Sequence, residues 1–346
     1  MKPELERYSR QVLFSELGEA GQTRLMQSSV LLCGCGALGT VLAETLVRAG
    51  VGHLKIVDRD FVEISNLQRQ VLFDESDVAA KLPKAIAAVE KLKKINSTVQ
   101  IEAVVEDIDH TNILGLAENV DLILDGTDNF EVRYLINDVS LELGIPWIYC
   151  GCIGSTGQTM TILPGKSACL RCLIDSAPEP GSTETCDTAG ILGPTVNVIA
   201  SLEAVDAIKL LSGQVEQIKP VLTVIDVWDG SFRQMSVAEL REKGKCKACH
   251  QGERIWLNGE QGSRTTRLCG RNAVQVSPAG KGKIVFEELA VKLRNSGTVD
   301  VNPYLLRLNL KNPDYEISLF RDGRAIIKGT DDPSVAKTIY ARYIGS

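Results

Sequence analysis

The sequence predicts an α/β protein with a doubly wound, mainly parallel sheet and helices on both faces, followed by a small C-terminal α+β module. Two observations support this prediction. Over roughly the first 150 residues, short apolar runs of strand type alternate with segments of helical period, as in parallel sheets covered by helices. Beyond residue 266 the alternation gives way to several strand-like runs and two helical segments.

The individual elements follow from local patterns. Residues 1–27 are expected to form one or two helices. Apolar runs predict strands at 29–33, 53–58, 99–105, 120–125 and 146–150, and helical spacing predicts helices at 40–49, 84–95 and 196–211. In the C-terminal module we expect strands at 305–310, 316–320 and 324–328 and helices at 286–294 and 333–343. Residues 176–194, with several prolines and glycines, predict a long loop, and long loops are often functional.

These patterns divide the 346 residues into two predicted domains. The first covers residues 1–250 and the second residues 266–346, with a polar linker at 251–265. A hydrophobic fraction of 44% and a charged fraction of 24% are typical of globular proteins.

Charge and apolar content exclude several classes of function. The net charge of −6 leaves no basic footprint for nucleic acid. No apolar run approaches the roughly 18 residues of a membrane span. The polar start of the chain predicts no export signal and a cytoplasmic protein. The ten cysteines are therefore expected in a reducing compartment, which favours metal binding or thiol chemistry over disulfides.

A glycine-rich motif predicts a nucleotide site. Gly34, Gly36 and Gly39 follow the first strand and open a helix, which is the Rossmann-like arrangement that directs backbone N–H groups at phosphates. Asp58 ends the second strand, nineteen residues after the last glycine, where a carboxylate can bind ribose hydroxyls. By themselves these residues also fit a nicotinamide dinucleotide site.

The residues after Asp58 favour ATP. Asp60, Asn66 and Arg69 add an acid, an amide and a cation just beyond the nucleotide strand. An enzyme that splits ATP needs cations and a metal-binding acid around its phosphates. A dehydrogenase has little use for an arginine there, because its pyrophosphate already lies on the glycine loop.

Six segments together resemble the ThiF/MoeB/HesA family of E1-like adenylyltransferases. Members of this family activate ubiquitin-like sulfur-carrier proteins in thiamine and molybdopterin synthesis. The resemblance covers roughly residues 5–250, with the segments in the same order and at nearly the same spacing. The segments are residues 7–11, 34–39, 58–60, 65–70, 83–84 and 125–129.

The resemblance implies ATP-dependent adenylation of the C-terminal glycine of a small carrier ending in Gly-Gly, with pyrophosphate release and transient Mg²⁺. It also implies a homodimer in which Arg10 reaches into the neighbouring subunit's site. Because residues 79–82 form a stretch about two residues longer than usual in the family, Lys81 is an alternative to Lys84. The implied ATP and Mg²⁺ site consists of the glycine loop with Asp58, Asp60, Ser65, Asn66, Arg69, Lys84, Asp128 and Asn129.

Two Cys-x-x-Cys pairs predict a structural zinc site. Cys169 and Cys172 form one pair, and Cys246 and Cys249 form the other. Four thiolates suit a closed, tetrahedral Zn²⁺ centre. Two redox-active pairs remain an alternative. The Cys246–His250 stretch also matches c-type haem attachment, which would require export.

Cys186 lies in the predicted loop, and the resemblance implies a covalent link from its thiol to the activated carrier; a spectator thiol is the alternative. The other five cysteines, Cys269 among them, are predicted to be packing residues.

The C-terminal module lacks a rhodanese pattern, so sulfur would come from a separate cysteine desulfurase or sulfurtransferase. Binding of the carrier, binding of a downstream enzyme and dimer support all remain open roles for this module.

Several functions remain open within this interpretation. Residues 188–194 look more like the thiamine-thiazole branch than the molybdopterin branch. More distant alternatives are an NAD(P)-dependent oxidoreductase, a non-catalytic carrier-binding module and a relative that dehydrates a modified tRNA base.

Overall fold

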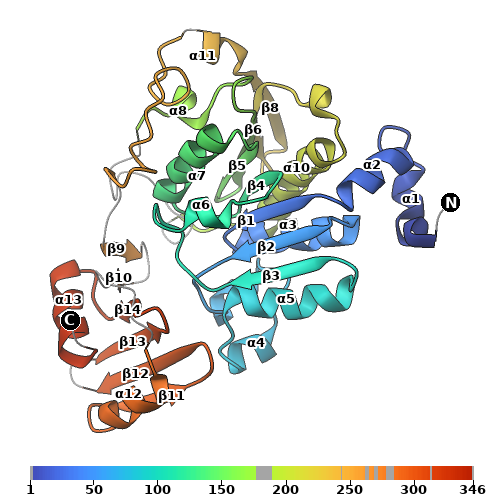
Figure 1. The fold of residues 1–346 in the computed structure, drawn as a ribbon. Helices are drawn as coiled ribbons and strands as arrows, with labels where there is room; N and C mark the ends of the chain where they lie inside the picture. Colours follow the sequence, from blue (N-terminus) through green and yellow to red (C-terminus); the bar gives the residue numbers. More distant parts are fainter. Residues whose placement is uncertain are drawn as a thin grey trace. The chain divides into compact units, whose positions relative to one another are not determined.

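The structure is a computed structural model, and it describes residues 3–176, 189–242, 244–261, 265–268, 272–277, 284–311 and 314–344. Cys186 and Cys269 lie outside the described residues. The chain divides into two compact units, Met1–Gln261 and Gly262–Ser346 (Figure 1).

The described part of the first unit contains an eight-stranded sheet in the order β3-β2-β1-β4-β5-β6-β7-β8. The five strands predicted from the sequence are present and pair in parallel. They are β1 (Ser29–Cys33), β2 (His53–Val57), β3 (Gln100–Val104), β4 (Leu122–Asp125) and β5 (Trp147–Ile153). The mainly parallel α/β fold is thus confirmed.

An antiparallel extension continues this sheet beyond β5. Its strands are β6 (Thr156–Ile162), β7 (Val221–Asp226) and β8 (Ser231–Ser236). These three strands are not among the elements predicted from the sequence. Antiparallel strands can expose one face to water and need no continuous apolar run, and β8 is exposed at most positions.

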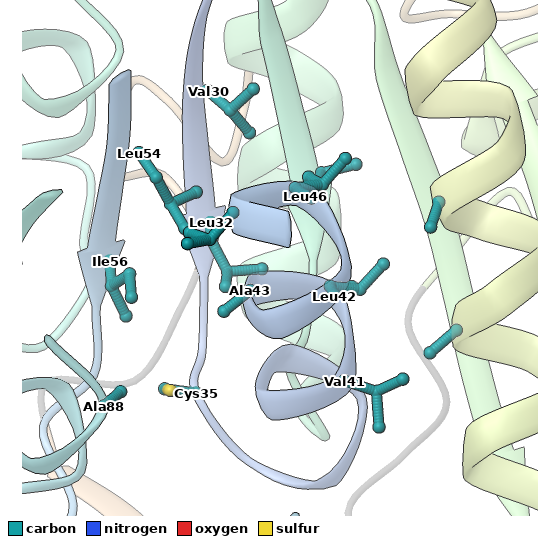
Figure 2. Packing of buried hydrophobic residues seen from close by; sticks show 14 of the residues in the cluster. Val30, Leu32, Cys35, Val41, Leu42, Ala43, Leu46, Leu54, Ile56 and Ala88 are labelled. Atoms are coloured by element: carbon teal, nitrogen blue, oxygen red, sulfur yellow. The ribbon is translucent and has the colours of Figure 1, made fainter. Parts of the chain in front are cut away.

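Helices cover both faces of the sheet and create two cores. Val30 and Leu32 of β1 belong to one core, whereas Leu31 and Cys33, which alternate with them, belong to the other. Figure 2 shows Leu32 of β1 next to Ala43 of α3. The first core is covered by α2 (Gly18–Leu25), α3 (Ala37–Ala49), α4 (Glu75–Ala79), α5 (Lys84–Ile95) and α10 (Gly193–Leu211). The second is covered by α6 (Ile113–Leu116), α7 (Phe130–Leu143), α8 (Leu170–Leu173) and α11 (Ala238–Glu242).

The carboxyl ends of the central strands meet at one edge of the sheet. Cys33 at the end of β1 is in register with Val57 of β2 on one side and Asp125 of β4 on the other. The strand order therefore reverses about β1, and ligands of open α/β sheets bind at such a switch point. Each loop that carries a predicted nucleotide residue begins at this edge.

The second unit contains, in its described residues, a six-stranded sheet in the order β11-β12-β13-β14-β10-β9. Its strands pair antiparallel, and its apolar core includes residues of both helices, so the small α+β module is confirmed. The strands are β9 (Thr265–Leu268), β10 (Ala273–Val276), β11 (Thr298–Val301), β12 (Leu305–Lys311), β13 (Asp314–Phe320) and β14 (Ala325–Lys328). The helices are α12 (Phe286–Leu293) and α13 (Pro333–Tyr343).

Residues 251–261, expected as part of a linker, pack on the first unit instead. The Trp256 ring stacks on Tyr134 of α7, with centroids 5.2 Å apart. The Trp256 and Leu257 N–H groups donate to the Asp138 carboxylate at 3.0 and 3.3 Å. The segment is mostly polar, so the two apolar side chains that attach it to the first unit were not recognised in the sequence.

Among the described helices, none has the length and apolar character needed to cross a membrane.

Candidate active site and metal centre

The glycine loop leaves room for a ligand at one glycine and none at the other two. Gly34 has φ of +88°, and a Cβ there would lie 2.8 Å from the Gly126 carbonyl oxygen. A Cβ at Gly39 would overlap the Gly34 carbonyl oxygen. At Gly36 the nearest atoms of the described residues would be 3.8 Å or more from a Cβ, so those residues leave this space open. Close approach of a phosphate to the Gly36 backbone fits this arrangement.

Asp58 supports this loop from the end of β2. One carboxylate oxygen accepts the Cys35 N–H at 2.6 Å, and the other accepts the Asp60 N–H at 2.6 Å. Burial raises the pKa of Asp58, whereas the nearby Lys84 ammonium acts to lower it. Because a carboxylate offers about four lone-pair sites, two remain for the hydroxyls of a ribose.

Lys84 is buried beside Asp60. It is the first residue of α5, and the whole residue is only 3% exposed. Its N–H donates to the Asp60 carbonyl at 2.9 Å, and its Nζ lies 3.2 Å from Asp60 Oδ2. Lys81, the alternative lysine, lies in the turn before α5, with φ of +51°. The structure therefore brings Asp58, Asp60 and Lys84 together.

The segment between Ser65 and Gln70 lies next to the glycine loop. Asn66 is buried, and its side-chain oxygen accepts the Glu63 N–H at 3.0 Å. Arg69 is half-buried and donates from Nη1 to the Ser65 carbonyl at 2.8 Å. Gln70 is 3% exposed, and its amide nitrogen would lie 3.9 Å from a Cβ at Gly36.

The loop after β4 packs against the glycine loop from the other side. A Cβ at Gly126 would overlap the Gly34 carbonyl oxygen, so the two loops are in close contact. Asp128 is exposed, and Asn129 caps α7 by accepting the Glu131 N–H at 2.8 Å. Burial acts to lower the pKa of Arg59, but Asp107, Asp60 and Asp128 raise it, and the net shift is upward. Asp128 thus lies within electrostatic reach of the residues that follow β2.

The four cysteines of the two Cys-x-x-Cys pairs converge although 74 residues separate the pairs. Their Sγ atoms all lie within 4.8 Å of one another. The Cys169 sulfur is 3.8 Å from Cys172 and 3.6 Å from Cys246, and Cys172 is 3.4 Å from Cys249. A regular tetrahedron of thiolates with Zn–S bonds of about 2.3 Å has edges of about 3.8 Å. The donor set therefore fits zinc, and one shared cluster replaces two separate redox pairs.

The comparison with known families decides the classification. The model described as "ThiF family" matches residues 8–249. The chain belongs to the ThiF family.

Individual relatives agree with this assignment. The chain is 44% identical over 340 residues to "Sulfur carrier protein ThiS adenylyltransferase" of Bacillus subtilis (strain 168), with 98% of this chain and 99% of the relative covered. It is 37% identical over 244 residues to the protein of the same name from Escherichia coli (strain K12), with 70% and 94% covered. It is 34% identical over 247 residues to "Adenylyltransferase and sulfurtransferase MOCS3" of Xenopus laevis, with 71% and 54% covered.

Solved structures agree on the fold. The structure entitled "Crystal structure of E. coli MccB + Succinimide" superposes with a TM-score of 0.59 at 25% identity, over 67% of this chain and 72% of that chain. The likeness in fold therefore extends over about two thirds of this chain.

Arg10 is separate from the other family residues within its own chain. It is exposed on the short helix α1 (Ser9–Val12). The neighbouring Gln11 donates to the Ala49 carbonyl at 3.0 Å, which is at the C-terminal end of α3. The glycine loop lies at the other end of this thirteen-residue helix, roughly 20 Å away by helical rise.

Sequence reasoning missed two buried charged residues under this site. Arg133 of α7 contacts Asp125 of β4 and the Thr127 carbonyl in the loop that follows, and Glu203 of α10 is fully buried within electrostatic reach of Asp125. The available signal was a charged side chain inside an otherwise apolar helical stretch. Whether such a side chain is buried becomes visible only when the packing of the helix against the sheet is known.

Proposed function

We propose that this chain transfers AMP from ATP to the C-terminal glycine of a ubiquitin-like sulfur carrier of the ThiS type, which ends in Gly-Gly, for thiamine biosynthesis. The observation that carries the proposal is the 44% identity to a ThiS adenylyltransferase over nearly the whole chain. Relatives named for both adenylyl and sulfur transfer are less similar. Sulfur would then be delivered by a separate desulfurase or sulfurtransferase.

The proposed reaction is an in-line substitution at the α-phosphorus. A carboxylate oxygen of the carrier's last glycine attacks, and the bond from the α-phosphorus to the bridging oxygen breaks. Pyrophosphate leaves with the bonding electron pair, and the product is a mixed anhydride of carrier and AMP. The attacking carboxylate is already ionised at pH 7, so no general base is required. Cations that neutralise the approaching anions are the main requirement.

The glycine loop and its neighbours supply the proposed binding groups. Asp58 would bind the ribose, and the open backbone at Gly36 would receive a phosphate. Arg69 and the buried Lys84 would neutralise charge on the leaving pyrophosphate. The remaining members of this proposed site are Gly34, Gly39, Asp60, Ser65, Asn66, Asp128 and Asn129.

Magnesium fits the exposed carboxylate of Asp128. Oxygen ligands suit this ion, which usually binds through one or two carboxylates and the substrate phosphates. When bound, Mg²⁺ would supply charge neutralisation at the β- and γ-phosphates. The loop contact between Gly126 and Gly34 supports this role, because it holds the residues after β4 beside the proposed phosphate site.

A homodimer would bring Arg10 to a second active site. Arg10 is exposed, and its own glycine loop is at the opposite end of α3. An arginine this far from its own site can serve adenylation only from a neighbouring copy. This position supports the family expectation of a site completed by the partner subunit.

The proposal is tested by pyrophosphate exchange with two carriers. A ThiS-type carrier should support exchange of labelled pyrophosphate into ATP, and a molybdopterin-type carrier should support much less. Preference for the molybdopterin-type carrier would overturn the thiamine assignment. Binding of NAD in preference to ATP would favour an oxidoreductase instead.

Zinc should be structural. Purified protein should hold about one Zn²⁺ per chain. The Cys172→Ser variant should lose zinc and unfold at a lower temperature, because the metal joins the segment around α8 to residues 246–249. Elemental analysis and thermal unfolding measure both effects, with Cys152→Ser, outside the cluster, as the control. Wild-type protein that is metal-free and equally stable in chelator would contradict the assignment.

Cys186 is proposed to capture the adenylate. Its thiolate would attack the carrier's carbonyl carbon, the bond to the AMP oxygen would break, and a thioester would form as AMP leaves. Cys186 itself lies outside the described residues, which resume at residue 189. Gly154, which follows β5, donates to the Gly190 carbonyl at 2.9 Å and accepts the Leu192 N–H at 3.0 Å. Four extended residues span about 14 Å, so a thiol at 186 can reach the carboxyl edge of the sheet.

The Cys186→Ser variant should separate the two steps. Adenylation needs no thiol, so pyrophosphate exchange should stay close to wild type. The carrier adduct that added thiols release should disappear from non-reducing gels. Lost exchange in a folded variant would show that the loop serves adenylation. A persistent adduct would assign capture to another cysteine.

A further inference from the structure

Arg133 is buried directly beneath the loop that carries Asp128. The residue is 6% exposed, four residues after the Asn129 cap of α7. Its Nε donates to Asp125 Oδ2 at 2.9 Å, and its second terminal nitrogen donates to the Thr127 carbonyl at 2.7 Å. The guanidinium carbon lies 5.1 Å from the centre of the Phe130 ring and 5.4 Å from that of Tyr149. Two aromatic rings and two hydrogen bonds therefore fix its orientation.

Asp125 holds the same loop from the strand side. It is fully buried, and its Oδ1 accepts both the Thr127 N–H at 2.9 Å and the Thr127 hydroxyl at 2.7 Å. The Thr127 backbone is thus held on both sides, by Asp125 at its N–H and by Arg133 at its carbonyl. Asp128 is the next residue. Its backbone position is therefore set by this ion pair.

The charges around the pair make Arg133 necessary. Glu203 of α10 is fully buried, and burial followed by the charge of Asp125 raises its pKa well above the usual value. Asp125 is a fully buried carboxylate, and the Arg133 guanidinium is its ion-pair partner at 2.9 Å. Without the guanidinium, the charge of Asp125 would be buried and uncompensated.

We propose that Arg133 is a positioning residue for the adenylation reaction, acting through Asp125 and the Thr127 carbonyl to hold Asp128 in the geometry that binds Mg²⁺ with ATP. This inference rests on the proposed function. It concerns how the metal-binding carboxylate is held, and not which carrier is used.

The Arg133→Lys variant tests the proposal. Lysine keeps the charge but lacks the planar fork that makes both hydrogen bonds at once. Changes to groups that orient a metal ligand typically cost 10- to 100-fold in affinity, so the Mg²⁺ concentration that half-saturates ATP binding should rise about tenfold or more. Calorimetric titration of ATP at increasing Mg²⁺ measures this shift. Carrier-dependent exchange should recover at high Mg²⁺.

A matched control distinguishes positioning from simple stabilisation. Arg324 in the second unit is also buried, lies 3.6 Å from a carboxylate oxygen of Asp322 and stacks on Phe320 at 3.9 Å. Arg324→Lys should lower the unfolding temperature without changing the Mg²⁺ dependence. If Arg133→Lys behaves in the same way, with fewer active molecules but unchanged half-saturation, the proposal is wrong.

A double-mutant cycle supplies a second criterion. Because Arg133 would act through Asp128, adding Arg133→Lys to Asp128→Asn should change Mg²⁺-dependent ATP binding little further. Independent, additive effects would overturn the proposal. If Arg133→Lys does not fold, Asp125→Asn replaces it in both measurements, with the same criteria.

Wild-type protein that binds Mg²⁺-ATP but shows no carrier-dependent exchange would refute the proposed function, while the double-mutant cycle would still decide the role of Arg133.

Discussion

Replacing Arg69 by alanine should lower carrier-dependent ATP–pyrophosphate exchange by about 10²-fold or more, the usual effect of removing a group that stabilises transition-state charge. The fold should be unaffected, because the hydrogen bond from Arg69 to the Ser65 carbonyl is exposed. Surface substitutions of this kind typically change stability by about 0.5 kcal/mol or less. Exchange rate and unfolding temperature are measured on the same preparation.

Arg48→Ala is the control for this prediction. Arg48 is an exposed arginine, and it pairs with Glu44 on α3 at 2.7 Å. Its loss should leave exchange near the wild-type rate. If Arg69→Ala is as active as Arg48→Ala, Arg69 does not contact the reacting phosphates.

Lys84→Met should produce the other large effect. Methionine fills a similar volume in the buried site and removes only the charge, so exchange should fall about 10²-fold. Some stability should be lost as well, because Lys84 Nζ lies 3.2 Å from Asp60 Oδ2 and that carboxylate loses a partner. Assays below the unfolding temperature of the variant separate the two effects.

Lys81→Met is the matched control, because Lys81 lies in the turn just before α5 and Lys84 is the first residue of that helix. Lys81 lies in a turn and is more exposed than Lys84. Its substitution should change exchange by less than about threefold, as expected for a residue without a transition-state role. A large loss for Lys81→Met with a small loss for Lys84→Met would assign the phosphate-binding cation to Lys81.

The parallel half of the first unit could be predicted because its signals are local. Strands β1, β4 and the first half of β5 are apolar runs buried on both faces, so their positions are visible in the sequence. The glycine loop, Asp58 and Asp125 each follow or end a strand whose carboxyl end lies at the same edge. Once parallel pairing is predicted, their proximity follows. The two cysteine pairs similarly carry a spacing that suits one metal.

Other features depend on tertiary contacts that local patterns do not encode. The last strand, β8, is exposed at most positions, so it has no apolar run to reveal it. Arg133 sits on a helix, and its role is visible only when α7 is packed under the loop after β4. Trp256 attaches a polar segment by stacking on Tyr134, more than a hundred residues earlier in the chain. Pairings of this separation are set by the folded sheet.

The central claim is that the chain transfers AMP to the carrier's C-terminal carboxylate. Intact-mass analysis of a ThiS-type carrier after incubation with this protein, ATP and Mg²⁺ tests it most directly. We expect the carrier to gain the mass of one AMP group, located on its last glycine, and a carrier lacking that glycine to gain none. An unmodified carrier in the presence of folded, zinc-loaded protein and hydrolysable ATP, or AMP found on any other residue, would contradict the proposed reaction.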